Sequence, residues 1–444
     1  MLEINKTHAG DCLKIMQQID NNSIDLILCD PPYGTTKCKW DSIIPLDLMW
    51  AQLKRIAKEN TAIVLMAGQP FTSNLIMSNI EMFIKELVKG NGSTKLEYRE
   101  KLASKAFGLT AYYDAMITNW FNKKLQIDFP DRKVFFGRKY KSLRYGENPH
   151  QKAAIYINDF KDRETGLKKI HGKDLSFNNY SDIYSSLDIL SYFKKSNTTV
   201  IIKHGNPCGV SSNRSRLLSF KNAFACDPVS AFGGIIACNF KIDKKTATEI
   251  AKNFCEVVIS KGFDKKALNI LKSKKNLRLI NFSKYKYLNK TIAKFFDNSF
   301  LMQEKNQRIM DSNKLRFVTR IKPSKKDLKE LEFANKVCKF VKSNAIVITK
   351  DMSTIGIGAG QPSRLDSCKI AIQKAKLFRR NKVKNSYAAS DAFFPFKDGI
   401  KTLAKAGVKN VVQPGGSLKD KEVIEEADNK KLKMILTGLR HFNH

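Results

Sequence analysis

Short apolar segments alternate with helical stretches along most of this 444-residue chain, and that alternation constrains the fold more than any other feature. It is typical of α/β folds, in which helices cover the faces of a sheet. Before residue 80 we expect helices at 11–19 and 46–57 and strands at 24–29 and 62–66. After Arg144 we expect strands at 199–202, 234–237, 257–259, 345–348, 411–412 and 434–436. At roughly 100–200 residues per domain, the length predicts about two to four domains.

Two further helices are indicated by spacing and by a start signal. Apolar residues from Leu102 to Phe121 recur at helical spacing, which predicts one long amphipathic helix. Ser324 and Asp327 form a capping-box pattern, and we expect the helix that begins there to run to about Lys342. The polar stretch 89–94 separates the first α/β region from the long helix.

The charge balance is strongly basic, with 79 Lys and Arg against 42 Asp and Glu, or +37. Such a balance suggests a polyanion such as nucleic acid as a partner. The lysines are spread over the whole chain, however, and aromatic residues are not interleaved with them at stacking positions. We therefore expect solvated lysine-rich surfaces, with nucleic acid an unlikely partner.

Cysteine spacing and hydropathy indicate the cellular compartment in which we expect the protein to lie. The nine cysteines are odd in number and form no Cys-x-x-Cys pair, so we expect a reducing compartment, no disulfide framework and no metal site. The longest apolar runs are far shorter than the ~20 residues of a spanning helix, and residues 1–15 lack a signal-peptide pattern. We expect a soluble, cytoplasmic protein with no membrane partner.

An Asp-Pro-Pro-Tyr motif (Asp30, Pro31, Pro32 and Tyr33) directly follows the expected strand 24–29. A carboxylate and an aromatic side chain at the end of a strand suit the recognition of an exocyclic amine on an extruded base. With AGDC at 9–12 and AGQPF at 67–71, residues 1–84 resemble the N-terminal, catalytic part of an amino-directed DNA methyltransferase. The simpler alternative is a strand that ends in a proline turn.

The resemblance covers only half of such an enzyme. Its permuted members bind S-adenosylmethionine with a Phe-x-Gly-x-Gly loop downstream, and the nearest match here, Gly356-Ile-Gly358-Ala-Gly360, follows an isoleucine. We therefore expect a partial Rossmann-like fragment with a vestigial motif, and we do not expect S-adenosylmethionine to bind.

Lys203 and His204 directly follow the expected strand 199–202. A histidine suits general-base chemistry near neutral pH, and a lysine offers a cation to developing negative charge. The alternative is a surface lysine beside a structural histidine. Cys208 as a nucleophile paired with His204 is a third possibility, against which a small buried thiol is the simpler interpretation.

A series of motifs surrounds this pair in a fixed order. They are LRYGENPHQ at 143–151, SFNN at 176–179, DPVSAFGG at 227–234, KSNA at 342–345, GAGQPSR at 358–364, SDAFFPFKD at 390–398, QPGGS at 413–417 and RHFNH at 440–444. Together they resemble the transformylase domain of the AICAR transformylase/IMP cyclohydrolase family, over residues 132–444. The resemblance implies formyl transfer from 10-formyltetrahydrofolate to the 5-amino group of AICAR, two cytidine-deaminase-like subdomains and a homodimer.

The resemblance also implies a role for each matched residue. His204 and Lys203 are the expected catalytic pair. The expected nucleotide-holding residues are Arg144, Tyr145 and Arg440, whereas the residues expected to line the base pocket are Asn179, Phe232, Gly233, Glu256, Asn344, Phe393 and Phe442. The residues expected to approach the folate are Arg364, Asp398, Ser417 and Leu418.

Residues 85–131 resemble the last helix of the cyclohydrolase domain of that family, through GST at 92–94, REKLA at 99–103 and KAFGLTAYYD at 105–114. The body of that domain would precede this helix, where the methyltransferase-like residues stand. We therefore expect domains at 1–84, 85–131 and 132–444 with no IMP formation. Two alternatives remain open: a DNA amino-methyltransferase or DNA-binding protein acting through residues 1–84, and an inactive chimera.

Overall fold

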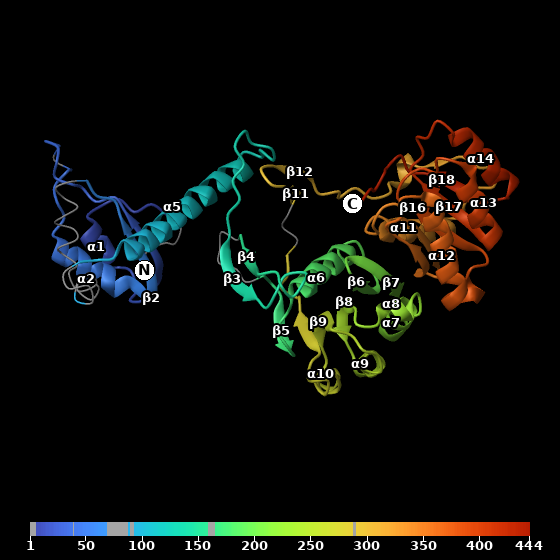
Figure 1. The fold of residues 1–444 in the computed structure, drawn as a ribbon, viewed down its shortest axis with the longest axis horizontal. Helices are drawn as coiled ribbons and strands as arrows, with labels where there is room; N and C mark the ends of the chain where they lie inside the picture. Colours follow the sequence, from blue (N-terminus) through green and yellow to red (C-terminus); the bar gives the residue numbers. More distant parts are fainter. Residues whose placement is uncertain (1–5, 39, 69–87, 89–92, 159–164, 287–289) are drawn as a thin grey trace. The chain divides into compact units, whose positions relative to one another are not determined.

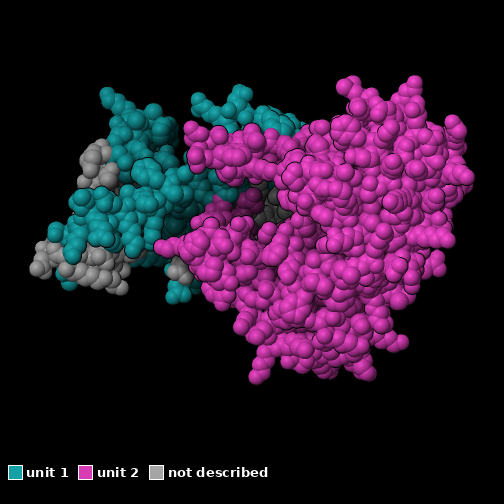
Figure 2. Space-filling view, turned by 45° about the vertical axis from the view of Figure 1, so that its right-hand side comes forward, with its two compact units in different colours: residues 1–136 teal, residues 137–444 magenta. Residues whose placement is uncertain are grey.

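We describe the fold from a computed structural model, in which residues 6–38, 40–68, 88, 93–158, 165–286 and 290–444 are described. The chain divides into two compact units, Met1–Phe136 and Gly137–His444, which Figure 2 shows in different colours. The expected join near residues 80–90 lies almost wholly outside the described residues, as do Gln69, Pro70 and Phe71 of the expected flanking motif. Each unit is treated by itself below.

The first unit contains a parallel βαβ arrangement (Figure 1). Strand β1 (Ile24–Cys29) lies parallel to β2 (Ala57–Leu65), and helix α2 (Leu46–Ile56) makes the crossover that parallel strands require. The buried apolar side chains of this arrangement are Ile27, Met49, Trp50, Leu53 and Ile56. The prediction for β1 is confirmed. Helix α1 (Cys12–Met16) is shorter than expected, because hydrogen bonds from Gln18 to Ile15 and from Ile19 to Met16 turn the chain more tightly after it.

The long amphipathic helix is present as α5 (Leu96–Lys124), which begins at Leu96 rather than Leu102. Among its described side chains, only that of Ala115 is buried. Several of its other apolar residues, including Phe107 and Trp120, are exposed within the chain.

The second unit is built on a 12-stranded mixed sheet of described residues, in the order β13-β18-β17-β16-β14-β15-β7-β6-β8-β9-β10-β5. The strands of its first half are β5 (Lys168–His171), β6 (Asn197–Lys203), β7 (Asn206–Asn213), β8 (Ile235–Ile242), β9 (Val257–Phe263) and β10 (Arg278–Asn281). The strands of its second half are β13 (Arg316–Phe317), β14 (Ile346–Lys350), β15 (Ser353–Gly358), β16 (Ser386–Ser390), β17 (Val408–Gln413) and β18 (Lys433–Leu436).

The two halves meet at β7 and β15, where Ser211 pairs with Ser353. The contact is polar: the two serine hydroxyls lie 2.8 Å apart, and the Val210 amide donates to the Thr354 hydroxyl at 2.9 Å. Buried hydroxyls are stable here because each finds a partner on the facing strand.

Helices cover both faces of the sheet. Those of the first half are α6 (Phe177–Leu190), α7 (Arg216–Phe224), α8 (Pro228–Ala231), α9 (Lys244–Ala251) and α10 (Lys265–Lys272), and those of the second half are α11 (Lys325–Cys338), α12 (Arg364–Arg379), α13 (Lys397–Ala406) and α14 (Asp420–Asn429). Strand β6 shows the layering, because Val200 and Ile202 join the core cluster beneath α6, whereas Ile201 joins the cluster beneath α7. The expected α/β architecture with a large sheet is confirmed.

Two smaller features complete the second unit. Antiparallel hairpins are formed by β3 (Arg138–Leu143) with β4 (Ala153–Ile157) and by β11 (Thr291–Phe295) with β12 (Phe300–Glu304), and 3-10 turns lie at Ser312–Lys314 and Arg380–Lys382. The predicted capping box of Ser324 and Asp327 is confirmed, although α11 ends at Cys338 and not at Lys342. Among the described helices, none has both the length and the apolar composition of a bilayer span.

Two glycines of the Gly356-Ile-Gly358-Ala-Gly360 stretch, Gly356 and Gly358, have a packing role. A Cβ on Gly358 would lie 1.9 Å from the Ser367 carbonyl oxygen of α12, and one on Gly356 would lie 2.1 Å from that of Ala371. Gly209 of β7 meets the Ala223 carbonyl of α7 in the same way. Since Gly356 and Gly358 lie inside β15, against α12, they serve close strand–helix packing.

Candidate active site

The predicted pair, Lys203 and His204, lies at a tight turn between β6 and β7. Lys203 pairs with Asn206 across the hairpin, which leaves His204 and Gly205 as the two turn residues. Both have positive φ, 54° for His204 and 72° for Gly205, as a two-residue turn of type I′ requires. A non-glycine residue in this conformation is strained and needs support from its surroundings.

Asp182 on α6 supplies that support. Its carboxylate accepts hydrogen bonds from the backbone amides of His204 at 3.1 Å and Gly205 at 2.7 Å. Burial raises the pKa of this carboxyl group, although the two amide hydrogen bonds oppose the shift. Asp182 is not among the residues predicted from the sequence. A signal was present, since Asp182 lies one helical turn after Asn179 of the SFNN motif and so shares its face of α6.

The Lys203 ammonium group is held from a second segment. Its Nζ donates to the Phe232 carbonyl oxygen at 2.8 Å, directly after the short helix α8. Gly233 follows with a φ of 75°, and a Cβ at that position would lie 4.0 Å from the Lys203 Nζ. The sheet, the hairpin turn and the α8 turn therefore together set the position of Lys203.

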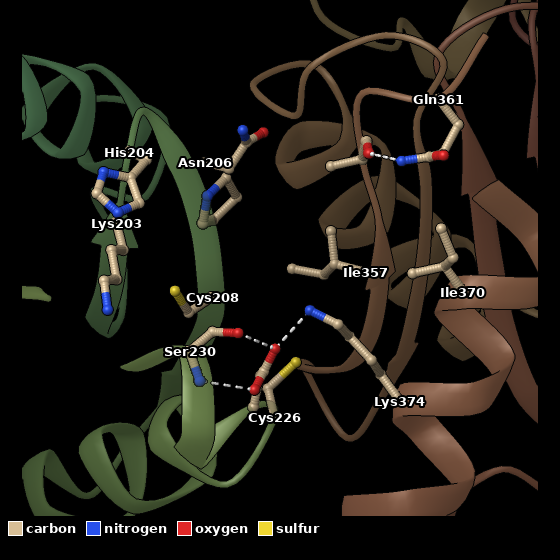
Figure 3. Close-up of a pocket in the computed structure, with 13 residues that line it drawn as sticks. Lys203, His204, Asn206, Cys208, Cys226, Ser230, Ile357, Gln361, Ile370 and Lys374 are labelled. Carbon is tan, nitrogen blue, oxygen red and sulfur yellow. Dashed lines mark hydrogen bonds and ion pairs between the residues drawn. The ribbon is translucent and has the colours of Figure 1, made fainter. Parts of the chain in front are cut away.

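A first cavity, of about 450 Å³, opens beside this pair (Figure 3). Residues from both halves of the sheet line it: Lys203, His204, Asn206, Pro207, Cys208, Cys226, Asp227, Ser230, Ile357, Ala359, Gln361, Ile370 and Lys374. Burial raises the pKa of the Cys208 thiol to about 12, so the thiolate is scarce at neutral pH. The geometry thus favours the buried-thiol interpretation of Cys208 over the nucleophile.

A second cavity, of about 800 Å³, is rich in cations. The basic side chains that line it are Arg144, Lys173, Lys252, Lys274, Lys275 and Arg278. Glu256 is the one carboxylate among its described lining residues, and Phe232 and Phe254 add aromatic surface, with their ring centroids 5.0 Å apart. Such a lining suits a planar ligand that carries an anionic group.

A third cavity, of about 460 Å³, gathers predicted residues of the second half of the sheet: Asn344, Arg364, Phe393, Asp398 and Phe442. The Arg364 guanidinium group is buried, and it donates to the Ser390 hydroxyl at 2.7 Å and to the Asn344 Oδ1 at 2.6 Å. Arg364 therefore fixes Asn344 within the chain, in addition to its place in the wall of this cavity.

The remaining predicted residues lie at the edges. Arg144 stacks over the Tyr145 ring at 4.7 Å, and Arg440 stacks over the Phe442 ring at 4.5 Å. Ser417 accepts a hydrogen bond from the Lys419 amide, and Leu418 is fully exposed. Ser417 and Leu418 line none of these three cavities. The described chain thus gathers most predicted residues around three cavities rather than one.

The Asp-Pro-Pro-Tyr motif of the first unit has its own geometry. It follows β1 as expected, and the Tyr33 hydroxyl donates to the Asp30 Oδ1 at 2.5 Å. Three backbone amides of the next turn, from Gly34, Thr35 and Thr36, donate to the buried Asp41 carboxylate. This part of the chain is therefore an ordered turn that begins at the end of a strand.

Comparisons with known proteins identify the family. The family model described as "AICARFT/IMPCHase bienzyme" matches residues 76–374, so residues 1–75 lie outside that match. A bifunctional purine biosynthesis protein PurH from Bradyrhizobium diazoefficiens is 42% identical over 378 residues, which are 81% of this chain and 70% of the relative. PurH proteins from Leptospira biflexa and Thermoanaerobacter sp. strain X514 are each 41% identical over 405 residues, 91% of this chain and 77% of the relative.

The formyltransferase activity of this family implies a folate-type one-carbon donor. The family match takes in residues 76–84, the end of the segment that resembles a methyltransferase. That resemblance is not shown by these matches and stays a prediction. The chain belongs to the AICARFT/IMPCHase bienzyme family, and it is an AICAR formyltransferase of purine biosynthesis.

Proposed function

We propose that the chain transfers the formyl group of 10-formyltetrahydrofolate to the 5-amino group of AICAR, and that it does not close the ring to IMP. The observation that carries the proposal is the contact of Lys203 with Phe232. The ammonium group of Lys203 lines the first cavity and donates to the Phe232 carbonyl, while Phe232 also lines the cationic second cavity. The expected catalytic pair is thereby joined to a cavity suited to a nucleotide.

The second cavity supports a nucleotide as one substrate. Arg144 is positioned over Tyr145 by stacking, and its guanidinium group offers paired donors of the kind that match phosphate oxygens. Glu256 in this lining offers polar atoms for the base, and Asn179, which lines none of the three cavities, donates to the Glu256 carboxylate. AICAR combines a phosphate with a planar heterocycle, and both find complementary groups in this lining.

The chemical step needs a base and a cation. The AICAR amine is a weak nucleophile because its lone pair is delocalised into the ring and the carboxamide. As the amine nitrogen bonds to the formyl carbon, His204 accepts the amine proton and Lys203 stabilises the negative charge on the formyl oxygen. The bond from the formyl carbon to folate N10 then breaks, and N10 takes up a proton. Asp182 keeps the His204 turn in place throughout.

The folate and the second subunit belong to the same proposal. Four residues are carried by the helices and loops that accompany the second half of the sheet: Arg364 in α12, Asp398 in α13, and Ser417 and Leu418 before α14. We assign these residues to the folate and propose that a homodimer completes each site. In this proposal the two halves of the sheet are the two cytidine-deaminase-like subdomains.

The absence of ring closure rests on the order of segments. Helix α5 falls within residues 85–131, which resemble the last helix of a cyclohydrolase domain, and residues 1–84, which resemble a methyltransferase fragment, precede it. In this proposal the domains are 1–84, 85–131 and 132–444, and no cyclohydrolase residues are assigned.

The experiment compares His204→Ala and Lys203→Met with Lys194→Met, a change at an exposed lysine in the turn between α6 and β6. We expect His204→Ala to lower kcat for formyl transfer by about 100-fold or more, as loss of a general base does. AICAR binding, measured by calorimetry, should persist, and Lys194→Met should match the parent protein. Normal turnover by His204→Ala would refute the base assignment.

A further inference from the structure

The first cavity contains an ion pair that the catalytic proposal does not use. Asp227 is buried, with 4% of its side chain exposed, and its Oδ2 accepts from the Lys374 Nζ at 2.5 Å. Lys374 belongs to α12 in the second half of the sheet, whereas Asp227 precedes α8 in the first half. Figure 3 shows Lys374 and Ser230 on opposite sides of the carboxylate to which the dashed lines join them.

Asp227 is also the N-cap of α8. Its Oδ1 accepts from the Ser230 backbone amide at 2.9 Å, and its Oδ2 accepts from the Ser230 hydroxyl at 2.7 Å. A carboxylate at this position satisfies amide groups that the first helical turn leaves without partners. Because α8 spans only Pro228–Ala231, its geometry depends strongly on this cap.

The short helix leads directly to the group that holds Lys203. Phe232 is the C-cap of α8, and its carbonyl oxygen accepts from the Lys203 Nζ at 2.8 Å. The next residue is fixed too, since the Gly233 amide donates to the Phe254 carbonyl at 3.0 Å. A displacement of α8 would therefore move the carbonyl that orients the Lys203 ammonium group.

Lys374 is held in place by the close packing of its helix, α12. Its helix packs against β15 at Gly356 and Gly358, where no side chain separates helix from strand. Without the ammonium group, the buried Asp227 carboxylate would lose its opposite charge, and a buried charge without a partner is costly. The Asp227 carboxylate at the N-cap would then move or take up a proton.

We propose that Lys374 is a positioning residue for formyl transfer, which acts through Asp227 and α8 to set where the Phe232 carbonyl holds the Lys203 ammonium group. This inference rests on the proposed function. It adds Lys374, on a helix that covers the other half of the sheet, to the residues that orient the Lys203 ammonium group.

The test compares Lys374→Met with Lys369→Met on the same helix. Lys369 pairs with Asp366 at 3.0 Å, but both side chains of that pair are more than half exposed. We expect Lys374→Met to lower kcat about tenfold with both KM values within twofold of the parent, and Lys374→Arg to restore most of kcat. Lys369→Met should match the parent. If Lys374→Met does not fold, Lys374→Gln replaces it. We expect the kcat of Lys374→Gln to lie between that of the parent protein and that of Lys203→Met.

A double-mutant cycle with Lys203→Met separates positioning from general stability. If Lys374 acts only through Lys203, adding Lys374→Met to Lys203→Met leaves kcat within twofold. A further tenfold loss in the double variant, or parental kcat in Lys374→Met, would overturn the inference. Failure of the proposed function would look different, because the parent protein itself would then show no formyl transfer.

Discussion

The Asn179 side-chain amide donates to the Glu256 Oε2 at 2.9 Å, across 77 residues of sequence. Arg278 approaches the same carboxylate from β10, with its Nη1 3.5 Å from that oxygen. Asn179 is itself fixed at the start of α6, where it forms a capping box with Ser176. Glu256, which lines the cationic cavity, thus joins Asn179 at the start of α6 to Arg278 at the cavity wall.

Replacing Glu256 with Gln should weaken AICAR binding more than it slows turnover. The amide keeps the shape of the side chain but removes the charge that Asn179 and Arg278 contact. We expect KM for AICAR to rise about tenfold, in line with the loss of one charge-assisted hydrogen bond, and kcat to change less than threefold. Steady-state rates at varied AICAR test this, with Glu332→Gln on α11 as the control. An unchanged KM would remove Glu256 from the substrate site.

Asp182→Ala should slow the chemical step. The two backbone amides at His204 and Gly205 would lose their acceptor, and the strained turn that presents His204 would relax. We expect kcat to fall at least about tenfold, because small displacements of a base from reacting atoms are costly. The control is Asp188→Ala on the same helix, which removes an ion pair with Lys305 and leaves the His204 turn untouched. Equal rates for the two variants would contradict the role of Asp182.

Acid should destabilise the fold through His441. Burial, followed by the charge of Lys339, lowers the pKa of His441 from 6.5 to about 4. Between these values the unfolded chain binds a proton that the folded chain does not, so the free energy of unfolding falls as pH falls. The contribution of His441 lost by pH 5 should be about 2 kcal/mol. It is fully present above the unfolded pKa of 6.5.

Thermal unfolding at pH 7 and pH 5 tests this prediction with His441→Gln, which keeps a polar side chain of similar size. The variant should lose less stability between the two pH values than the parent does. A parallel loss in the parent and His441→Gln would show that other groups cause the acid sensitivity.

Asp30→Ala should leave formyl transfer unchanged. Asp30 accepts a hydrogen bond from Tyr33 within the first unit, and the proposed reaction assigns no role to either residue. The measurement is the steady-state rate, together with calorimetry of S-adenosylmethionine added to the parent protein, which should give no heat of binding. A lower rate in Asp30→Ala would connect the first unit to formyl transfer, and saturable S-adenosylmethionine binding would show that the motif is not vestigial.

The elements that the sequence predicted well are those with a strong apolar pattern. Strand β1 has the predicted bounds, and the apolar centre of β6 fell on residues 199–202 as expected. Strands β7, β15 and β16 were not predicted, because serine, glycine and alanine interrupt their apolar residues and leave no continuous apolar run. Their burial depends on hydroxyl pairs such as Ser211 with Ser353, which form only when distant strands meet.

The same limit applies to the candidate site. The sequence located Lys203 and His204 by a motif and Glu256 by the family resemblance outside the quoted motifs, each as a position along the chain. Asp182 and Lys374 act through contacts across 22 and 147 residues. The helical spacing from Asn179 is a local signal for Asp182, but no local pattern marks Lys374. The glycines at 356 and 358 also have a purely spatial explanation, since only the close approach of α12 shows why a side chain is excluded.

The most direct test of the central claim is formyl transfer by the purified full-length protein. AICAR and 10-formyltetrahydrofolate are supplied, tetrahydrofolate release is followed, and the products are separated to distinguish formyl-AICAR from IMP. The account predicts tetrahydrofolate release with formyl-AICAR as the end product and no IMP. A folded protein that forms no formyl-AICAR, or one that goes on to IMP, would contradict it.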